Sequence, residues 1–106
     1  MIARLWTGVV ARRDRDAYVA YMEATGVGEY RRTPGCTFAA ILTRDLDENR
    51  TEVSALSLWE STTAIHAFAG DDITAMVLYP EDETYLLDEP ELRHYEVASR
   101  PAHPQP

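Results

Sequence analysis

One stretch decides the fold class, because its residues alternate as in a β-strand: Thr51-Glu52-Val53-Ser54-Ala55-Leu56-Ser57-Leu58-Trp59-Glu60. One face of this strand holds Val53, Ala55, Ser57 and Trp59, and the other holds Ser54, Leu56 and Leu58. Apolar residues on both faces are typical of a sheet that is covered on both sides. We therefore expect a sheet with one protein layer above it and another below.

Three other segments also have the residue pattern of strands. Ile2–Ala11 alternates and is rich in β-formers, and residues 36–44 and 92–99 resemble it. The charged loop at 45–49 predicts a hairpin that joins 36–44 to 51–60. Gly8, inside the first strand, indicates a bulge or a close approach of another part of the chain.

In the segments between the strands, apolar residues recur at the spacing of a helix. A first helix is expected from Asp14 or Asp16 to about Thr25, where Gly26 and Gly28 break it and 29–32 form a further turn. Its inner stripe would consist of Ala17, Tyr18, Tyr21, Met22 and Thr25. A second helix begins after Ser61 and ends at Gly70, and Asp71 or Asp72 is expected to start another helical turn or two before Pro80.

The order βαββαβ predicts an α+β, ferredoxin-like domain over residues 1–99, followed by a Pro-rich tail at 100–106. Its four-stranded antiparallel sheet should carry the helices on one face. The other face, with Leu56 and Leu58, would remain bare in a single chain. A second copy is expected to cover it, sheet against sheet, in a dimeric α+β barrel.

Composition excludes several classes of function. The formal net charge of -8 disfavours nucleic acid and anionic membranes as partners. A single cysteine, Cys36, leaves no intrachain disulfide, and no segment has the pattern of a signal peptide or membrane helix. A cytoplasmic location is the expectation.

Several motifs resemble a branch of the antibiotic-biosynthesis monooxygenase-like proteins of the dimeric α+β barrel superfamily. They are Leu58-Trp59-Glu60-Ser61, Ala64-Ile65-His66-Ala67-Phe68-Ala69-Gly70-Asp71-Asp72, Tyr79-Pro80-Glu81-Asp82 and His94-Tyr95-Glu96-Val97. The resemblance implies a homodimer with a pocket between the sheet and the helices of each subunit. Characterised relatives oxidise aromatic polyketide-type substrates with O2 and without a metal or flavin, and others are isomerases or cyclases.

Four residues are candidates for the chemistry. Trp59, which faces the pocket in relatives, is either a wall for an aromatic ligand or a core residue. Arg4 is either a donor to an oxyanion or a surface residue paired with an acid. His94 is either a base or a structural imidazole, and Tyr79 is either a phenol donor or a plug between helix and sheet.

A further set of residues is predicted to bind the substrate: Trp6, Tyr18, Tyr21, Met22, Phe68, Asp82 and Tyr85. Asp82 has the alternative role of a helix cap, and the aromatic residues could simply fill the core. No two histidines stand at i, i+4 and no Gly-rich phosphate loop is present, so neither a metal nor a cofactor is expected. The leading hypothesis is a cofactor-independent monooxygenase for a small aromatic ligand, and its rivals are a non-redox cyclase or isomerase and a non-catalytic binding dimer.

Overall fold

The computed structural model describes residues 1–100, and most of the predicted tail lies outside them. The strands are β1 (Ile2–Ala11), β2 (Cys36–Asp45), β3 (Arg50–Trp59) and β4 (Glu91–Glu96). The helices are the 3-10 turn η1 (Arg12–Asp14), α1 (Arg15–Ala24), α2 (Gly26–Arg32), α3 (Thr62–Ala69) and α4 (Asp82–Tyr85). The predicted order of elements is confirmed, and β1 has the predicted bounds.

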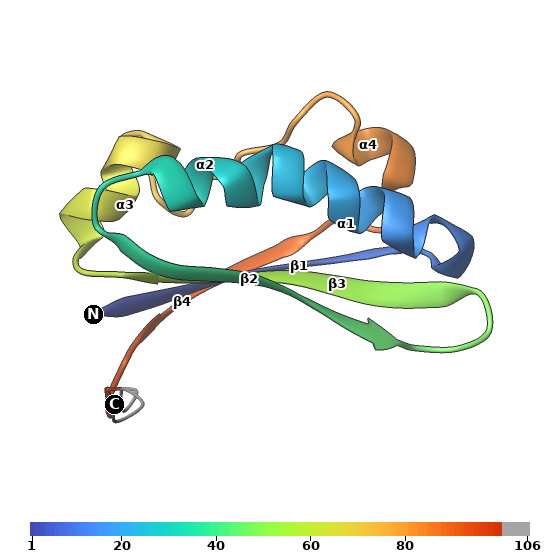
Figure 1. Ribbon diagram of the computed structural model, residues 1–106, viewed down its shortest axis with the longest axis horizontal. Helices are drawn as coiled ribbons and strands as arrows, with labels where there is room; N and C mark the ends of the chain where they lie inside the picture. The colour runs from blue at the N-terminus through green and yellow to red at the C-terminus, as the bar shows by residue number, and fades with distance from the viewer. Residues whose placement is uncertain (101–106) are drawn as a thin grey trace, which may run out of the picture.

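The four strands form one antiparallel sheet in the order β2-β3-β1-β4, as the ferredoxin-like prediction requires. The long central strands β1 and β3 pair along their whole length, from Ile2 opposite Trp59 to Ala11 opposite Arg50. All helices lie on the same side of this sheet (Figure 1). None of the helices within residues 1–100 is long and apolar enough to cross a membrane.

The core lies between the sheet and the helix layer. Its buried side chains come from β1 (Trp6, Val10), β3 (Val53, Ala55, Trp59), α1 (Tyr18, Met22), α2 (Val27, Tyr30) and α3 (Ile65). The register confirms the predicted division of β3, because Val53, Ala55 and Trp59 are buried while Leu56 and Leu58 face the opposite side. Burial of this one face provides most of the hydrophobic stabilisation of the single chain.

The first helical region departs from the prediction. The break between α1 and α2 lies at Thr25, with φ -112° and ψ -101°, and Gly26 and Gly28 belong to the second helix. The Thr25 hydroxyl donates to the Tyr21 carbonyl at 2.8 Å, a local bond that competes with a continuous helix. Ala17, expected on the inner stripe, is exposed because the stripe is narrower than predicted.

Of the one or two turns predicted after Asp71 or Asp72, one forms, with the Ala75 N–H donating to the Asp72 carbonyl at 3.1 Å, and the rest of residues 71–81 is irregular. Asp72 accepts hydrogen bonds from the backbone N–H and the hydroxyl of Thr74, at 3.0 and 2.6 Å. An aspartate that bonds its own chain two residues ahead favours a turn over a helix. The short helix α4 follows Pro80, in a segment for which the sequence pattern predicts no helix.

Candidate functional site

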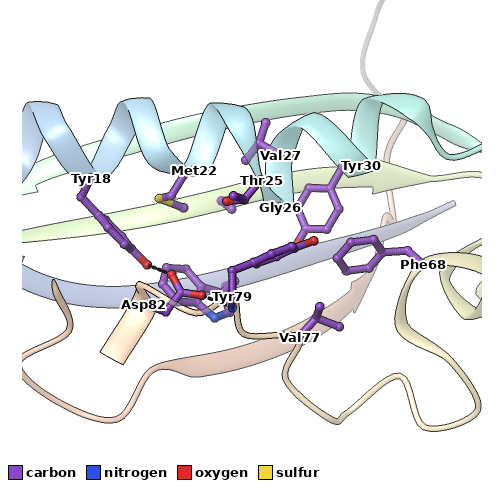
Figure 2. A pocket seen from close by; sticks show the side chains of 12 residues that line it. Tyr18, Met22, Thr25, Gly26, Val27, Tyr30, Phe68, Val77, Tyr79 and Asp82 are labelled. Atoms are coloured by element: carbon purple, nitrogen blue, oxygen red, sulfur yellow. Dashed lines mark hydrogen bonds between the residues drawn. The ribbon is translucent and has the colours of Figure 1, made fainter. Parts of the chain in front are cut away.

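A pocket that is about half open lies between the sheet and the helix layer, and it spans about 350 Å³ when the open solvent at its mouth is included. Its lining comes from β1 and β3 (Trp6, Ala55), α1 and α2 (Tyr18, Met22, Thr25, Gly26, Val27, Tyr30), α3 (Phe68) and the loop up to α4 (Val77, Tyr79, Asp82). Figure 2 shows Tyr18 and Asp82 at one end of the cavity and Tyr30 and Phe68 at the other. Aromatic rings therefore form much of the wall.

The carboxylate of Asp82 lies at one end of the cavity and is only 5% exposed. Its Oδ1 accepts a hydrogen bond from the Tyr18 hydroxyl at 2.8 Å, and its Oδ2 accepts one from the backbone N–H of Tyr79 at 2.6 Å. Burial, and then the hydrogen bond to Asp82, raise the pKa of Tyr18 well above its usual range. This end of the cavity thus holds a buried carboxylate beside a phenol that stays protonated.

Tyr79 connects the loop to α2. Its hydroxyl donates to Glu29 Oε2 at 2.6 Å, and burial followed by this hydrogen bond raises the pKa of Tyr79 above its usual range. The proton of this phenol is already bound to an acceptor of the chain. Tyr79 lines the cavity as a ring and keeps the loop attached to the helix layer.

Arg4 is buried, at 1% exposed, so its interpretation as a surface residue is wrong. Nη1 donates to the carbonyl of Ile73 at 2.8 Å and lies 2.9 Å from His94 Nε2. The guanidinium has only donors, so His94 Nε2 accepts this bond and the imidazole is neutral, with its proton on Nδ1. Burial, and then the charge of Arg4, lower the pKa of His94, which favours the same neutral form.

The charge of Arg4 has no acidic partner within residues 1–100, since none of the salt bridges there includes it. Its Nε is buried and makes no hydrogen bond to a described group. The Arg4 guanidinium carbon lies 5.7 Å from the ring centroid of Phe68, and Phe68 is one of the residues that line the cavity. A cation is thus held behind the Phe68 end of the cavity, where cation–π attraction helps to keep it.

Tyr30 is a cavity residue that the sequence analysis missed. It is 5% exposed, and its ring meets the Phe68 ring edge-on with centroids 4.6 Å apart. Burial raises the pKa of Tyr30, while the nearby Arg4 guanidinium acts in the opposite direction without overcoming it. The spacing of Val27 and Tyr30, three residues apart, was the available signal that 26–32 continues a buried helical stripe.

Six of the eleven predicted site residues line the cavity: Trp6, Tyr18, Met22, Phe68, Tyr79 and Asp82. Trp59 is fully buried outside the lining, and its indole N–H donates to Ser57 Oγ at 2.8 Å. Tyr21 and Tyr85 pack around Tyr18, and the Tyr21 hydroxyl accepts from the Glu81 N–H at 3.0 Å. Arg4 and His94 also lie outside the lining.

Within residues 1–100, no group of three or more His, Cys, Asp or Glu side chains is arranged to hold a metal ion. The cavity itself contributes one such side chain, Asp82.

The fold matches solved structures over nearly its whole length. One is a "putative antibiotic biosynthesis monooxygenase" from Bacillus cereus, with a TM-score of 0.69, 18% identity, and coverage of 96% of this chain and 97% of that one. A protein of the same description from Nitrosomonas europaea has a TM-score of 0.64 and 14% identity, with coverage of 93% of this chain and 100% of that one. Another from Deinococcus radiodurans has a TM-score of 0.62 and 13% identity, with coverage of 99% of this chain and 100% of that one. No protein-family model and no curated protein matches the sequence. The predicted likeness to these proteins is thereby confirmed as a likeness of fold.

Proposed function

We propose that this chain is a monooxygenase that oxidises a small aromatic or polyketide-like substrate with O2 and requires no metal or flavin. The observation that supports it most is the aromatic-walled cavity with a buried carboxylate, in a fold shared with proteins described as antibiotic biosynthesis monooxygenases.

The walls suit a flat ligand. Trp6 on the sheet, Phe68 on α3 and Tyr79 in the loop line the cavity with aromatic surfaces from three different elements. Stacked or edge-on contacts with such rings favour an aromatic ligand over an aliphatic one of equal size.

Asp82 is the proposed proton acceptor. Its carboxylate lines the cavity, and its two oxygens keep free lone pairs beside the bonds from Tyr18 and Tyr79. His94, predicted as the base, lies outside the lining with its Nε2 bound to Arg4, so we propose that it positions Arg4 instead.

The proposed reaction needs no outside reductant. Asp82 takes a proton from an activated CH2 group, and the carbanion gives one electron to O2. The resulting superoxide and substrate radical join in a C–O bond, and the peroxide takes the proton back. Cleavage of the O–O bond with loss of the second C–H hydrogen releases water and leaves a ketone or quinone carbonyl. The sum is one CH2 group and one O2 converted to one carbonyl and one water.

Oxygen uptake tests this proposal. Protein treated with a strong chelator should consume one O2 for each quinone formed from anthrone, with no hydrogen peroxide released. Asp82→Asn should lower kcat by about 100-fold or more, as the loss of a general base does. Asp88→Asn, which changes an exposed carboxylate beyond α4, should leave it unchanged. No turnover with anthrones, quinols and related phenols would overturn the proposal.

A cyclase or isomerase without redox chemistry is the second candidate, because Asp82 could serve proton transfer in the absence of O2. Product formation under strictly anaerobic conditions would favour it and defeat the oxygenase. Binding without any turnover would favour the third possibility, a non-catalytic binding protein.

A homodimer is the proposed assembly. The sheet face opposite the helices exposes apolar side chains, among them Phe38 and Leu42 at 49% and Tyr95 at 47%. We name this surface the open face: it consists of Phe38, Leu42, Tyr95 and the neighbouring Leu56 and Leu58. Several large apolar side chains exposed on one sheet face are typical of a protein interface, and a second open face is a complement to it.

A further inference from the structure

We propose that Tyr30, with Arg4 behind it, donates a hydrogen bond to a negatively charged oxygen of the ligand, so that the cavity selects aromatic compounds that bind as phenolates or enolates. The inference rests on the proposed function in taking this cavity as the substrate site. It adds the charge state of the ligand and a residue to recognise it.

The hydroxyl proton of Tyr30 is available for a ligand. Tyr18 and Tyr79 also line the cavity, but their hydroxyls donate to Asp82 and Glu29. No group within residues 1–100 accepts a hydrogen bond from Tyr30, and the guanidinium of Arg4, which acts to lower its pKa, is itself a donor. Of the three phenols in the wall, Tyr30 is therefore the one with an uncommitted donor.

Arg4 supplies the charge that an anion would need. It is 1% exposed, its Nε has no partner, and no carboxylate within residues 1–100 pairs with it. A buried cation without an anion is costly, and a ligand that brings a negative oxygen nearby would offset that cost. Arg4 does not line the cavity, so it acts through Tyr30 as a positioning residue that polarises the hydroxyl.

The other ionisable groups around Tyr30 do not cancel this charge. Cys36 on β2 has a pKa raised by burial, and Tyr79 in the loop has a pKa raised by burial and Glu29, so both are neutral near pH 7. His94 on β4 is held neutral behind Arg4, as its lowered pKa indicates. Glu29, the residue before Tyr30, has its Oε2 bound by the Tyr79 hydroxyl at 2.6 Å.

The two ends of the cavity then fix the direction of the ligand. Asp82 at one end repels a negative oxygen and can accept a proton, while Tyr30 at the other end can stabilise the oxygen (Figure 2). An anthrone-type substrate placed between them would lose its proton near Asp82 and carry the enolate charge to Tyr30. Stabilising charge where it develops is the larger part of catalysis in many enzymes.

The test is a binding titration with 4-nitrophenol, because its phenol and phenolate absorb at different wavelengths. Wild-type protein should bind the phenolate about tenfold more tightly than the phenol, which lowers the pKa of the bound probe by about one unit. Nitrobenzene, which lacks the oxygen, should bind more weakly and without this pH dependence.

Tyr30→Phe should remove most of the preference while keeping the ring and the fold. Tyr85→Phe is the matched control, since Tyr85 packs against Tyr18 outside the cavity lining and its loss should not change the preference. Equal binding of phenol and phenolate by the wild type, or an unchanged preference in Tyr30→Phe, would overturn the inference. Phenolate selection without oxygen uptake would defeat the oxygenase alone, and oxygen uptake without phenolate selection would defeat this inference alone.

Discussion

The two faces of the sheet are built from the same strands and differ in almost everything else. On the face under the helices, Arg4, Trp59 and Ser57 are at most 1% exposed, the Trp59 indole N–H donates to Ser57 Oγ, and Arg4 Nε has no partner among the described groups. On the open face, Phe38 and Leu42 are half exposed and no helix covers them. The covered face thus holds the buried polar groups, while the open face combines exposed apolar side chains with the Thr7–Ser54 hydrogen bond and the Arg44–Glu52 ion pair.

The difference shows how a chain of 106 residues can use the two faces of one sheet for two separate roles. Side chains alternate along a strand, so each strand contributes to both faces without extra residues. The helix-covered face places polar groups beside a cavity, where low exposure strengthens their interactions. The open face supplies, in our proposal, the contact to a second copy. The predictions below test this division, beginning with the largest effect.

Truncation on the covered face should be the most costly change. Trp59→Ala should lower the free energy of unfolding by about 3–5 kcal/mol, because it removes a fully buried indole and leaves a cavity. Leu42→Ala on the open face should cost less than about 1 kcal/mol in dilute, monomeric protein. Urea denaturation followed by circular dichroism measures both, and equal costs would contradict the division between the faces.

A charge on the open face should separate the proposed dimer. We expect the wild type to sediment at twice 12.0 kDa at micromolar concentration. Phe38→Asp should weaken the association by about 100-fold, which corresponds to about 2.7 kcal/mol, because a carboxylate would be buried between the sheets. Leu78→Asp, a change at an equally exposed apolar loop residue, is the control. A wild-type protein that sediments at 12.0 kDa would contradict the dimer itself.

Much of this division could be predicted from sequence, because strand alternation is a local property. The pattern of β3 correctly separated Trp59 from Leu58, and β1 was predicted with its observed bounds. The cap at Ser61 was also predicted, and its hydroxyl accepts from the Ala64 N–H at 3.2 Å. These features depend on neighbours in the chain and on few distant contacts.

What the sequence could not indicate depends on distant contacts. Arg4 was interpreted as a surface residue because its partners, the Ile73 carbonyl and His94, lie 69 and 90 positions away. Tyr30 was missed because the break at Thr25 was placed at Gly26, so 26–32 was not treated as a helix with a buried stripe. The loop at 71–81 was predicted to be helical because its apolar residues have helical spacing, but the hydrogen bond from the Thr74 N–H to the Asp72 side chain favours a turn there.

A substitution at Gly8 should affect the shape of the cavity on the covered face. A Cβ there would lie 2.7 Å from Leu86 Cδ2 and 2.8 Å from Trp6 Cη2, so the indole would have to move. Gly8→Ala should cost about 1–3 kcal/mol and weaken ligand binding. Gly26→Ala is the matched control, since its Cβ would meet Tyr79 at 3.5 Å, and it should leave stability unchanged or raised by about 0.5 kcal/mol. Equal effects of the two changes would contradict the close fit of Trp6.

The smallest expected effect is a dependence of stability on pH that belongs to the covered face. Burial and Arg4 lower the pKa of His94 below its ordinary 6.5, so below pH 6.5 the unfolded chain binds more protons at this position than the folded one. The free energy of unfolding should therefore fall as the pH drops from 6.5 toward the lowered pKa, and His94→Asn should flatten the curve there.

Other groups can be separated from this effect. The pKa values of Asp45, Asp47 and Asp72 are lowered from 3.8, so their contribution is lost at more acidic pH. His66→Asn changes an exposed histidine on α3 and should keep the slope below pH 6.5. An unchanged slope in His94→Asn would mean that Arg4 does not hold this imidazole neutral. A charge on His94 would then add to that of Arg4 near Tyr30, and the proposed selection of anionic ligands could no longer be assigned to Arg4 alone.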